Sequence, residues 1–438
     1  MSNTNPARGM RDFLPAQIRR REYVINIIKS VYESYGFQPL ETPAVENIET
    51  LTGKYGEEGN QLIYKILKRG EGAATGEADL ALRYDLTVPL ARVVANHKND
   101  LPKFFKRYQI QPVWRADRPA RGRYREFYQC DADAIGSNSM IVEAELISAV
   151  CEILDKLRFK DYLVKFNHRN LLFSILESAK VPIEKHNDAL VVIDKLDKLS
   201  VEQVSNELIQ KGISENSTKQ IMDLYQNVAT VWNRGVDVNE VLLSITLGND
   251  IDIREDLIKT INLVKNPRLL IYPFLARGLS YYTGSIFEIV LTNGDFQGSI
   301  GGGGRYDGLI GMFGKEQIPA CGFSLGLERI LVVMEERGMF PPELQNNSAD
   351  VMVTIWNADA IGESLKLAYD LRAEGLRVLV YPEADKLGKQ FKYASTINVP
   401  FVCVLGESEL AENKVTLKNM QTGEQETVAR EEIAAKVA

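Results

Sequence analysis

Residues 104–133 read FFKRYQIQPVWRADRPARGRYREFYQCDAD. The first and last thirds of this stretch alternate bulky and polar side chains, as β-strands do, and the middle gathers arginines around Pro119 and Gly122. The pattern predicts a β-hairpin with an arginine-rich loop. That loop could be a solvated turn that protects a sheet edge. Alternatively, because guanidinium groups stay charged and form paired hydrogen bonds, it could bind phosphate or carboxylate.

The composition bounds the class of protein. The chain has 438 residues, 45% of them hydrophobic and 25% charged, which predicts a globular protein of two or three domains. No apolar run approaches the roughly 20 residues of a membrane span, and the polar start lacks a signal-peptide pattern, so we expect a cytoplasmic protein without membrane contact. Four scattered cysteines predict neither a zinc site nor disulfides. The net charge of −7 leaves nucleic-acid binding to local basic patches.

A helix followed by an extended segment is predicted before the hairpin. The helix should end at Gly36, and residues 37–43 contain two prolines that keep them out of a helix. The apolar residues expected on one face of the helix are Ile18, Ile25, Ile28, Tyr32 and Tyr35. Such an element could belong to the core or could build a two-fold subunit interface.

Residues 82–90 form a short strand-like run with Asp85 and Thr87 on alternate positions, and hence on one face. Their oxygen atoms could cap the following helix. They could instead bind the ammonium group of a ligand.

The region from residue 172 to 262 is predicted to be a helical insertion. It combines short amphipathic patterns with many charged and amide residues, and it has no glycine-rich loop. The histidines of the chain, His97, His168 and His186, are isolated from one another. We therefore expect them to be structural and predict no metal site built from protein side chains.

Two later segments carry polar groups at strand ends. Residues 276–290 bring Arg277, Tyr281 and Tyr282 to the start of an apolar strand, a usual place for a site, although buried tyrosines often only satisfy core hydrogen bonds. Residues 299–308 contain four consecutive glycines, which weaken a strand but let a ligand lie against its backbone. A flexible linker is the alternative.

The remaining features of the sequence are Arg329, in a predicted helix, and a separate C-terminal region. Residues 318–334 predict a strand and then a helix starting near Gly326, so Arg329 lies at the positive end of the helix dipole and favours an anionic ligand. After a polar linker at 336–348, alternating strands and helices predict a small α/β domain with a parallel-type sheet. A lysine-rich helix in that domain could aid solubility or contact a phosphate backbone.

The common nucleotide-binding motifs are absent from the sequence. Neither Gly314-Lys315 nor Gly388-Lys389 completes a P-loop, and residues 301–304 do not complete a dinucleotide-binding fingerprint. A nucleoside triphosphate would therefore have to be held by arginines.

Three stretches resemble the signature motifs of class II aminoacyl-tRNA synthetases: residues 36–43, the hairpin with Arg115, and residues 322–329. The segments LRYDLTVP (82–89) and RGLSYYTG (277–284) are similar to motifs that mark the histidyl-tRNA synthetase family within that class. The resemblance implies an α+β fold with an antiparallel sheet flanked by helices. Its implied domains are a catalytic domain in two parts (1–171 and 263–335), the insertion (172–262), the linker (336–348) and an anticodon-binding domain (349–438).

The resemblance also implies an activity. The protein would be an ATP-dependent ligase that converts L-histidine and ATP, the latter associated with Mg²⁺, to histidyl-adenylate and pyrophosphate. It would then transfer histidine to the 3′ end of tRNA-His. A cytoplasmic homodimer that contacts the acceptor end and the anticodon of this tRNA is implied as well.

Carried over position by position, the resemblance assigns roles to single residues. Arg115 would bind the α-phosphate of ATP, Phe127 would stack on adenine and Arg329 would hold the distal phosphates, with Arg123 beside them. Arg277 would act with Arg115 at the reacting carboxylate and α-phosphate. The residues implied to surround histidine are Asp85, Thr87, Gln129, Asp133, Tyr281, Tyr282 and Tyr306. At the hairpin tip, Arg118, Arg121 and Arg123 would be free to meet the triphosphate or the tRNA acceptor end.

The implied chemistry agrees with these residue types. Arginines placed in advance can stabilise the charge that spreads over phosphoryl oxygens, without a covalent enzyme intermediate. A pocket that hydrogen-bonds an imidazole can reject apolar analogues, so no editing domain is required. Two alternatives stay open. A catalytically inactive regulatory paralogue of ATP phosphoribosyltransferase would lack the Arg277 motif and the C-terminal module, and a synthetase for another amino acid would have to explain the pair Tyr281 and Tyr282.

Overall fold

The computed structural model describes residues 4–197, 199–233, 251–277, 282–294, 296, 298–314, 316–344 and 349–437. By its internal contacts the chain divides into two compact units, Met1–Leu14 with Arg20–Met339 and Pro15–Arg19 with Phe340–Ala438. Each unit has its own sheet and its own hydrophobic core. None of the helices in these described ranges is long and apolar enough to cross a membrane.

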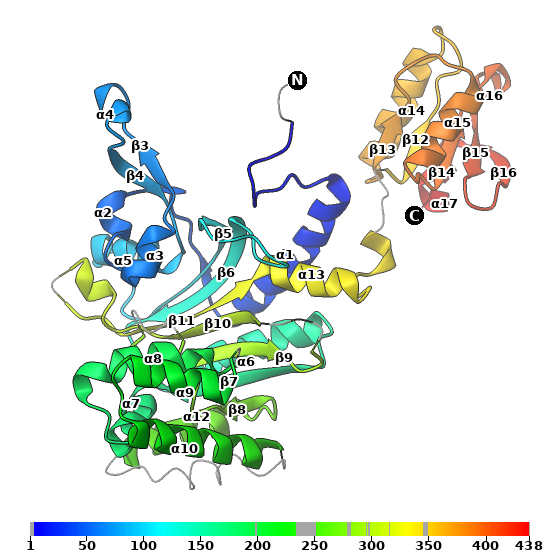
Figure 1. Ribbon diagram of the computed structural model, residues 1–438. Coiled ribbons are helices and arrows are strands. Elements are labelled where there is room, and N and C mark those ends of the chain that lie inside the picture. Colours follow the sequence, from blue (N-terminus) through cyan, green and yellow to red (C-terminus); the bar gives the residue numbers. More distant parts are fainter. Residues whose placement is uncertain are drawn as a thin grey trace. The chain divides into compact units, whose positions relative to one another are not determined.

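An eight-stranded sheet forms the centre of the first unit (Figure 1). In spatial order its strands are β1 (Gln38–Pro39), β5 (Phe105–Trp114), β6 (Glu126–Ile135), β11 (Ala320–Gly326), β10 (Ser299–Arg305), β9 (Ser285–Leu291), β7 (Tyr162–His168) and β8 (Leu269–Ile271). Neighbouring strands are antiparallel except at the two edges, where β1 pairs with β5 and β8 pairs with β7 in parallel. The expected α+β class with an antiparallel central sheet is confirmed.

The predicted hairpin is confirmed as the antiparallel pair β5 and β6, which lie side by side in Figure 1. Residues 115–125 form its loop. Gly122 adopts a φ of +67°, and a Cβ atom there would lie 3.2 Å from Arg329 Cγ, so both conformation and space favour glycine. The loop therefore folds against helix α13 (Leu327–Glu336).

Helix α1 (Pro15–Ser34) ends as predicted before Gly36, whose φ of +79° lies in the left-handed region. Its predicted apolar face is partly wrong, because Ile18 is exposed. The residues that α1 buries are Arg21, Val24, Ile28, Val31 and Tyr32. A charged residue begins this buried stripe because Arg21 Nη1 pairs with Glu328 Oε1 of α13 at 2.9 Å, and hydrophobic periodicity cannot detect such a pair.

A small three-stranded antiparallel sheet with short helices lies in the chain between β1 and β5. Its strands are β2 (Val45–Asn47), β4 (Ala78–Leu82) and β3 (Lys65–Leu67), in spatial order. The helices of this segment are α2 (Ile48–Leu51), α3 (Gly56–Gln61), α4 (Glu71–Ala74) and α5 (Thr87–Asn96). The apolar face of α5 shares a core with Phe105, Ile135 and Tyr306, which fixes the start of this helix beside the large sheet.

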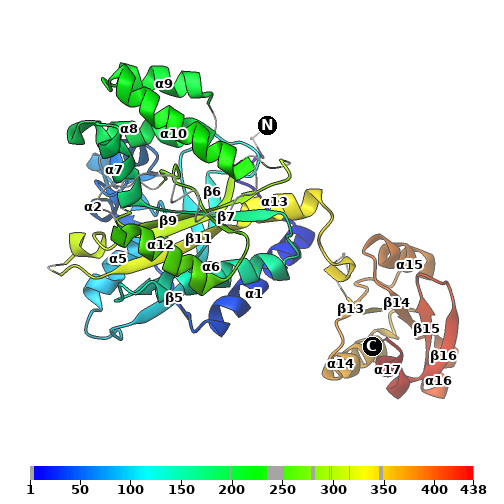
Figure 2. The ribbon, with the colours of Figure 1, turned by 90° about the horizontal axis from the view of Figure 1, so that it is seen from below.

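The described residues between β7 and β8 carry helices, drawn in green in Figure 1. They are α7 (Arg169–Ser178), α8 (His186–Ile193), α9 (Val201–Gln210), α10 (Glu215–Asn233) and α12 (Ile251–Val264). Figure 2 shows α12 beside α6 (Ile141–Lys156), the helix that follows the hairpin. All three histidines have partners within the fold. His97 Nδ1 lies 3.2 Å from Asp100 Oδ2, His168 Nδ1 accepts a hydrogen bond from Asn170 N and caps α7, and His186 Nε2 lies 3.0 Å from Val181 O.

The second unit contains a five-stranded sheet between helices. In spatial order the strands are β13 (Val378–Val380), β12 (Val351–Val353), β14 (Phe401–Val404), β15 (Lys414–Asn419) and β16 (Gln425–Ala429), and the helices are α14 (Ile361–Ala373), α15 (Leu387–Thr396), α16 (Glu407–Glu412) and α17 (Ile433–Val437). The predicted parallel arrangement holds for the first three strands. It is wrong for β15 and β16, which extend the sheet antiparallel. The chain returns through α16 between β14 and β15, and a short turn at residues 420–424 joins β15 to β16.

Candidate active site

A cavity of about 310 Å³ lies over the middle of the eight-stranded sheet. Strands β6, β11, β10 and β9 supply most of its lining. Residues that the sequence implicates and that line this one cavity are Asp85, Thr87, Arg115, Gln129, Asp133, Arg277, Tyr282 and Tyr306. Tyr281, which the sequence also implicates, lies outside the described residues. Segments from distant parts of the chain therefore meet at one place.

Asp85 both caps a helix and faces the cavity. Its Oδ1 atom accepts hydrogen bonds from the Val88 backbone N–H and the Tyr55 hydroxyl, each at 3.0 Å. The helix-cap alternative is therefore confirmed, and the cavity position leaves a ligand contact open. Burial raises the pKa of Asp85, whereas the Val88 N–H and the charge of Arg115 lower it. The prediction that Asp85 and Thr87 share one face of a strand is wrong, because α5 begins at Thr87.

Strand β6 presents Gln129, Asp131 and Asp133 to the cavity, because alternate residues of a strand point to the same side. Gln129 Nε2 donates a hydrogen bond to Ser324 Oγ of β11 at 2.8 Å. Gln129 Oε1 is buried without a hydrogen-bond partner among the described residues. Buried polar atoms are nearly always paired, so this oxygen marks a position where a ligand donor would fit.

The carboxylate of Asp133 is held from two sides. Arg107 Nη2 lies 2.9 Å from Oδ2, and the Tyr306 hydroxyl donates to Oδ1 at 2.5 Å. All three side chains are buried. Gly322, opposite Asp133 on β11, leaves room for this carboxylate, since a Cβ atom there would lie 1.8 Å from Asp133 Oδ1. Sequence reasoning missed Arg107, which reads as one more polar residue of an alternating strand.

Residues 301–304, the run of glycines, form the interior of β10 between β11 and β9. A Cβ atom on Gly303 would lie 2.1 Å from the carbonyl oxygen of Gly322. The flexible-linker alternative is therefore wrong. Gly302 and Gly303 give the cavity a wall made of backbone, against which a flat ligand can lie.

Arginines form a second group at the cavity, here called the arginine end: Arg115 and Arg277 line the cavity, whereas Arg329 and Arg123 do not line it but lie near them. Burial lowers the pKa of Arg329, and the positive charges of Arg123, Arg277 and Arg115 lower it further. Arg329 Nη1 donates to Ser299 O, which fixes its position in the first turn of α13. These four guanidinium groups repel one another, and such a cluster favours a ligand with several negative charges.

Arg115 stands between two aromatic rings. Its Nε donates to Tyr84 O at 3.0 Å, and its Cζ lies 4.3 Å from the ring centroid of Tyr84 and 5.2 Å from that of Phe127. Phe127 does not line the cavity itself, but the contact places its ring next to a lining residue.

Glu288 is a site residue that sequence reasoning missed. This residue of β9 is 2% exposed, lines the cavity, and places Oε1 2.7 Å from Arg277 Nη1. Arg277 Nη1 also lies 3.3 Å from Ser299 Oγ. A charged residue in the middle of the apolar strand SIFEIVL was the signal that could have revealed it.

The hairpin tip differs from expectation. Arg121 Nε donates to Glu336 Oε1 of α13 at 2.9 Å, and Arg123 makes two hydrogen bonds to Asp117, at 3.0 and 2.9 Å. The expectation that Arg118, Arg121 and Arg123 are all free for ligands is therefore wrong for Arg121 and Arg123. The Arg121–Glu336 pair is exposed, and in the other pair Arg123 is exposed while Asp117 is partly buried, so water screens both pairs and each can open for a ligand.

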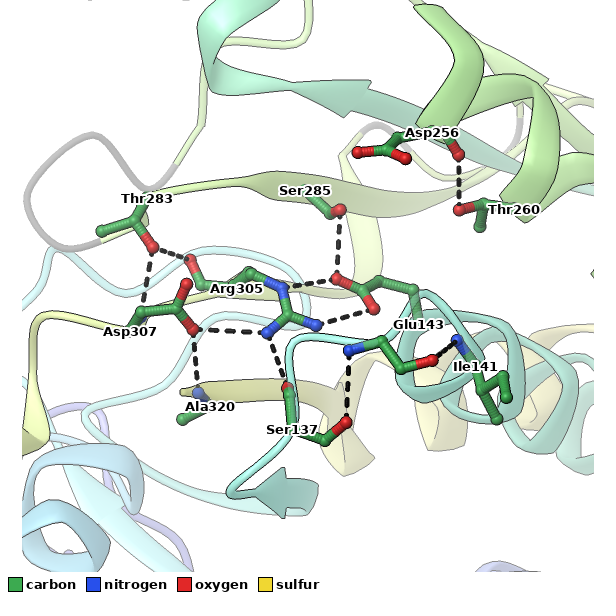
Figure 3. Close-up of polar contacts among 11 residues, drawn as sticks. Ser137, Ile141, Glu143, Asp256, Thr260, Thr283, Ser285, Arg305, Asp307 and Ala320 are labelled. Atoms are coloured by element: carbon green, nitrogen blue, oxygen red, sulfur yellow. Dashed lines mark hydrogen bonds and ion pairs between the residues drawn. The ribbon is translucent and has the colours of Figure 1, made fainter. Parts of the chain in front are cut away.

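Arg305, at the end of β10, forms a buried ion pair with Glu143 (Figure 3). Arg305 donates to both carboxylate oxygens of Glu143 in α6, at 2.7 and 2.8 Å. Although burial alone lowers the pKa of Arg305, the hydrogen bonds with Glu143 raise it above its ordinary value. The backbone N–H of Thr283 donates to Arg305 O at 2.7 Å, so the segment with Tyr282 and the strand leading to Tyr306 are tied together.

Known protein families match this chain over both of its compact units. Residues 9–330 match the family model of histidyl-tRNA synthetase, and residues 350–438 match that of an anticodon-binding domain. The chain is 40% identical to the histidine–tRNA ligase of Christiangramia forsetii, with 95% of each chain covered, and 40% identical to that of Bacteroides fragilis, with 97% of each covered. The crystal structure of histidyl-tRNA synthetase from Nostoc sp. PCC 7120 matches with a TM-score of 0.81 at 34% identity, covering 100% of this chain and 99% of that one. The chain belongs to the histidyl-tRNA synthetase family.

Proposed function

We propose that the protein activates L-histidine with ATP and transfers the histidyl group to the 3′ end of tRNA-His. The observation that carries this proposal is that one cavity is lined by two kinds of charged group. Buried carboxylates and Gln129 line it together with Arg115 and Arg277, and Arg329 and Arg123 lie near those two arginines. The first set fits an amino acid that brings an ammonium group and a ring N–H, and the second fits a polyphosphate.

The amino-acid end supplies acceptors for the donors of histidine. Asp85 and Gln129 are proposed to bind its ammonium group with Thr87, because Gln129 Oε1 is a buried acceptor and Asp85 is a buried carboxylate. Asp133 and Tyr306, together with the tyrosine pair at 281–282, are proposed to surround the imidazole. Burial raises the pKa of Asp133, and the positive charge of Arg107 beside it partly offsets this rise.

The reaction needs no protein nucleophile. A carboxylate oxygen of histidine attacks the α-phosphorus of ATP, the bond from that phosphorus to the bridging oxygen breaks, and pyrophosphate leaves. Arg115 and Arg277 are proposed to stabilise the charge on the α-phosphoryl oxygens, and Arg329 and Arg123 to hold the β- and γ-phosphates. Phe127, beside Arg115, is proposed to stack on adenine. Ion pairing with Glu288 fixes Arg277 before the substrates arrive.

Mg²⁺ is proposed to enter with ATP. Proteins usually hold this ion through one or two carboxylates together with phosphate oxygens. Glu288 is a carboxylate that faces the arginine end of the cavity, so the residues present fit an ion held mainly by the nucleotide. The ion would neutralise charge on the β- and γ-phosphates.

The second unit is proposed to bind the anticodon of tRNA-His, and the chain is proposed to work as a cytoplasmic homodimer, as its family membership supports. The regulatory-paralogue alternative predicts loss of the Arg277 motif and of the C-terminal module. Both are present, since Arg277 lines the cavity and residues 350–438 match an anticodon-binding domain. The second unit thus favours the ligase over the regulatory subunit.

The proposal is tested by ATP–pyrophosphate exchange with a panel of the standard amino acids. Histidine should support exchange, and every other amino acid should be at least about 10³-fold less effective, because analogues leave buried polar groups unpaired. Charging of tRNA-His with radiolabelled histidine then tests the second step. Exchange driven by another amino acid, or by none, would contradict the proposal.

A further inference from the structure

Asp131 lies between two residues proposed to bind histidine, yet neither the sequence motifs nor the proposed mechanism use it. It follows Gln129 and precedes Asp133 on the same face of β6. It lines the same cavity and is 2% exposed. A buried carboxylate in a ligand cavity requires a physical reason, because burying a charge costs free energy unless the charge is paired.

The protein supports Asp131 less fully than Asp133. Both oxygens of Asp133 have strong partners, in the Tyr306 hydroxyl and the Arg107 guanidinium. Asp131 has neutral partners: Gln129 Nε2 lies 3.5 Å from its Oδ1, and Ser324 contributes a side-chain hydrogen bond. The positive charge of Arg107 thus acts on both buried carboxylates, but Arg107 pairs directly with Asp133.

The charges around Asp131 leave an excess of negative charge. The groups that face it are Arg107 from β5, Asp133 from its own strand, Ser324 from β11 and Asp85 from the segment before α5. Burial raises the pKa of Asp131 to about 7; Arg107 lowers it, and Asp133 and Asp85 raise it. Near neutral pH, the pair of Asp131 and Asp133 therefore shares a proton in a large fraction of the ligand-free molecules.

We infer that Asp131 contacts the substrate and accepts a hydrogen bond from an imidazole N–H of histidine, which makes it a specificity-determining residue. The inference rests on the proposed function. In a buried site, a carboxylate whose hydrogen-bond partners in the protein are neutral favours a ligand that brings an N–H donor. When that donor arrives, the shared proton leaves the carboxyl group for solvent, so that binding releases protons near pH 7.

The direct test compares Asp131→Asn with the wild-type protein by titration calorimetry, using histidine and thiazolylalanine, whose ring has no N–H. The substitution should weaken histidine binding by about 10–100-fold and change thiazolylalanine binding less than about threefold, because only histidine loses a hydrogen bond to a charged group. The same exchange at an exposed position of β4, Asp79→Asn, should change neither. Equal weakening of both ligands would overturn the inference.

A second measurement uses the wild-type protein. Triazolylalanine keeps a ring N–H but stays neutral at pH 7, so any proton released on binding comes from the protein. Titrations in buffers of different ionisation enthalpy should show release of a fraction of a proton at pH 7, and Asp131→Asn should abolish it. No release from the wild-type protein would overturn the inference.

The melting temperature separates a binding role from a structural one. Because folding raises the pKa of Asp131, the folded protein binds more protons than the unfolded chain between about pH 4 and 7, so this group lowers stability as pH rises through that window. Asp131→Asn should therefore melt at an equal or higher temperature at pH 8, and a lower melting temperature would overturn the inference. Wild-type protein that binds no histidine would instead refute the proposed function itself.

Discussion

Replacing Arg277 with alanine should slow histidine-dependent pyrophosphate exchange by about 10³-fold or more, while the KM for histidine changes less than about tenfold. The reason is that Arg277 is placed to stabilise charge that develops at the α-phosphoryl group, a contact worth more in the transition state than in the ground state. A factor of 10³ corresponds to about 4 kcal/mol of transition-state stabilisation. Exchange rates at saturating ATP across a histidine series measure the effect.

The change also removes the guanidinium that pairs with the buried Glu288. The double variant Arg277→Ala with Glu288→Gln removes that charge and keeps the fold comparable. A matched control is Arg268→Ala, which breaks an ion pair with Asp155 near the start of β8 and should leave exchange unchanged. If the double variant exchanges at a near-normal rate, Arg277 has been assigned the wrong role.

Arg329→Ala should raise the KM for ATP by about 100-fold without lowering the stability of the ligand-free protein. Burial and the charges of Arg123, Arg277 and Arg115 already lower the pKa of Arg329, so its removal relieves repulsion in the free protein. The missing positive charge weakens the protein only in its complex with a polyphosphate, where Arg329 would pair with phosphate oxygens. Thermal melting with and without ATP measures both effects.

Arg337→Ala is the control, and we expect it to affect stability rather than ATP binding. Arg337, just after α13, makes two hydrogen bonds to Asp161, at 2.9 and 3.0 Å, and has no place in the cavity. Arg337→Ala should lower the melting temperature and leave the KM for ATP unchanged. Equal ATP effects in the two variants would show that α13 acts through its packing rather than through Arg329.

The sequence predicts the elements of this fold that depend on local pattern. The alternation in residues 104–133 leads directly to β5 and β6, and Gly36 ends α1 where the helical pattern predicts. Hydrophobic periodicity does not predict which charged residues are buried in the core. Arg21 is buried because Glu328, far away in the sequence, pairs with it, and no periodicity of α1 can show that.

The site is predictable to the extent that its residues stand in distinctive segments. Asp85, Arg115, Arg277 and Arg329 are found in motifs and adjoin or line one cavity in the fold. Glu288 was missed because it is a single acidic residue in an apolar strand, and Asp131 because it stands in a strand that also contains Glu126 and Asp133. Their roles depend on residues of neighbouring strands, and those neighbours are known only once the pairing of strands distant in the sequence is known.

The division of labour within the cavity is tested most directly by a crystal structure of the protein with histidine and a non-reactive ATP analogue. The expected density has the imidazole within hydrogen-bonding distance of Asp131 and Asp133, and the α-phosphate between Arg115 and Arg277. The histidine carboxylate should point at the α-phosphorus. Density with the ring at the arginine end, or with either ligand outside the cavity, would contradict the proposed function.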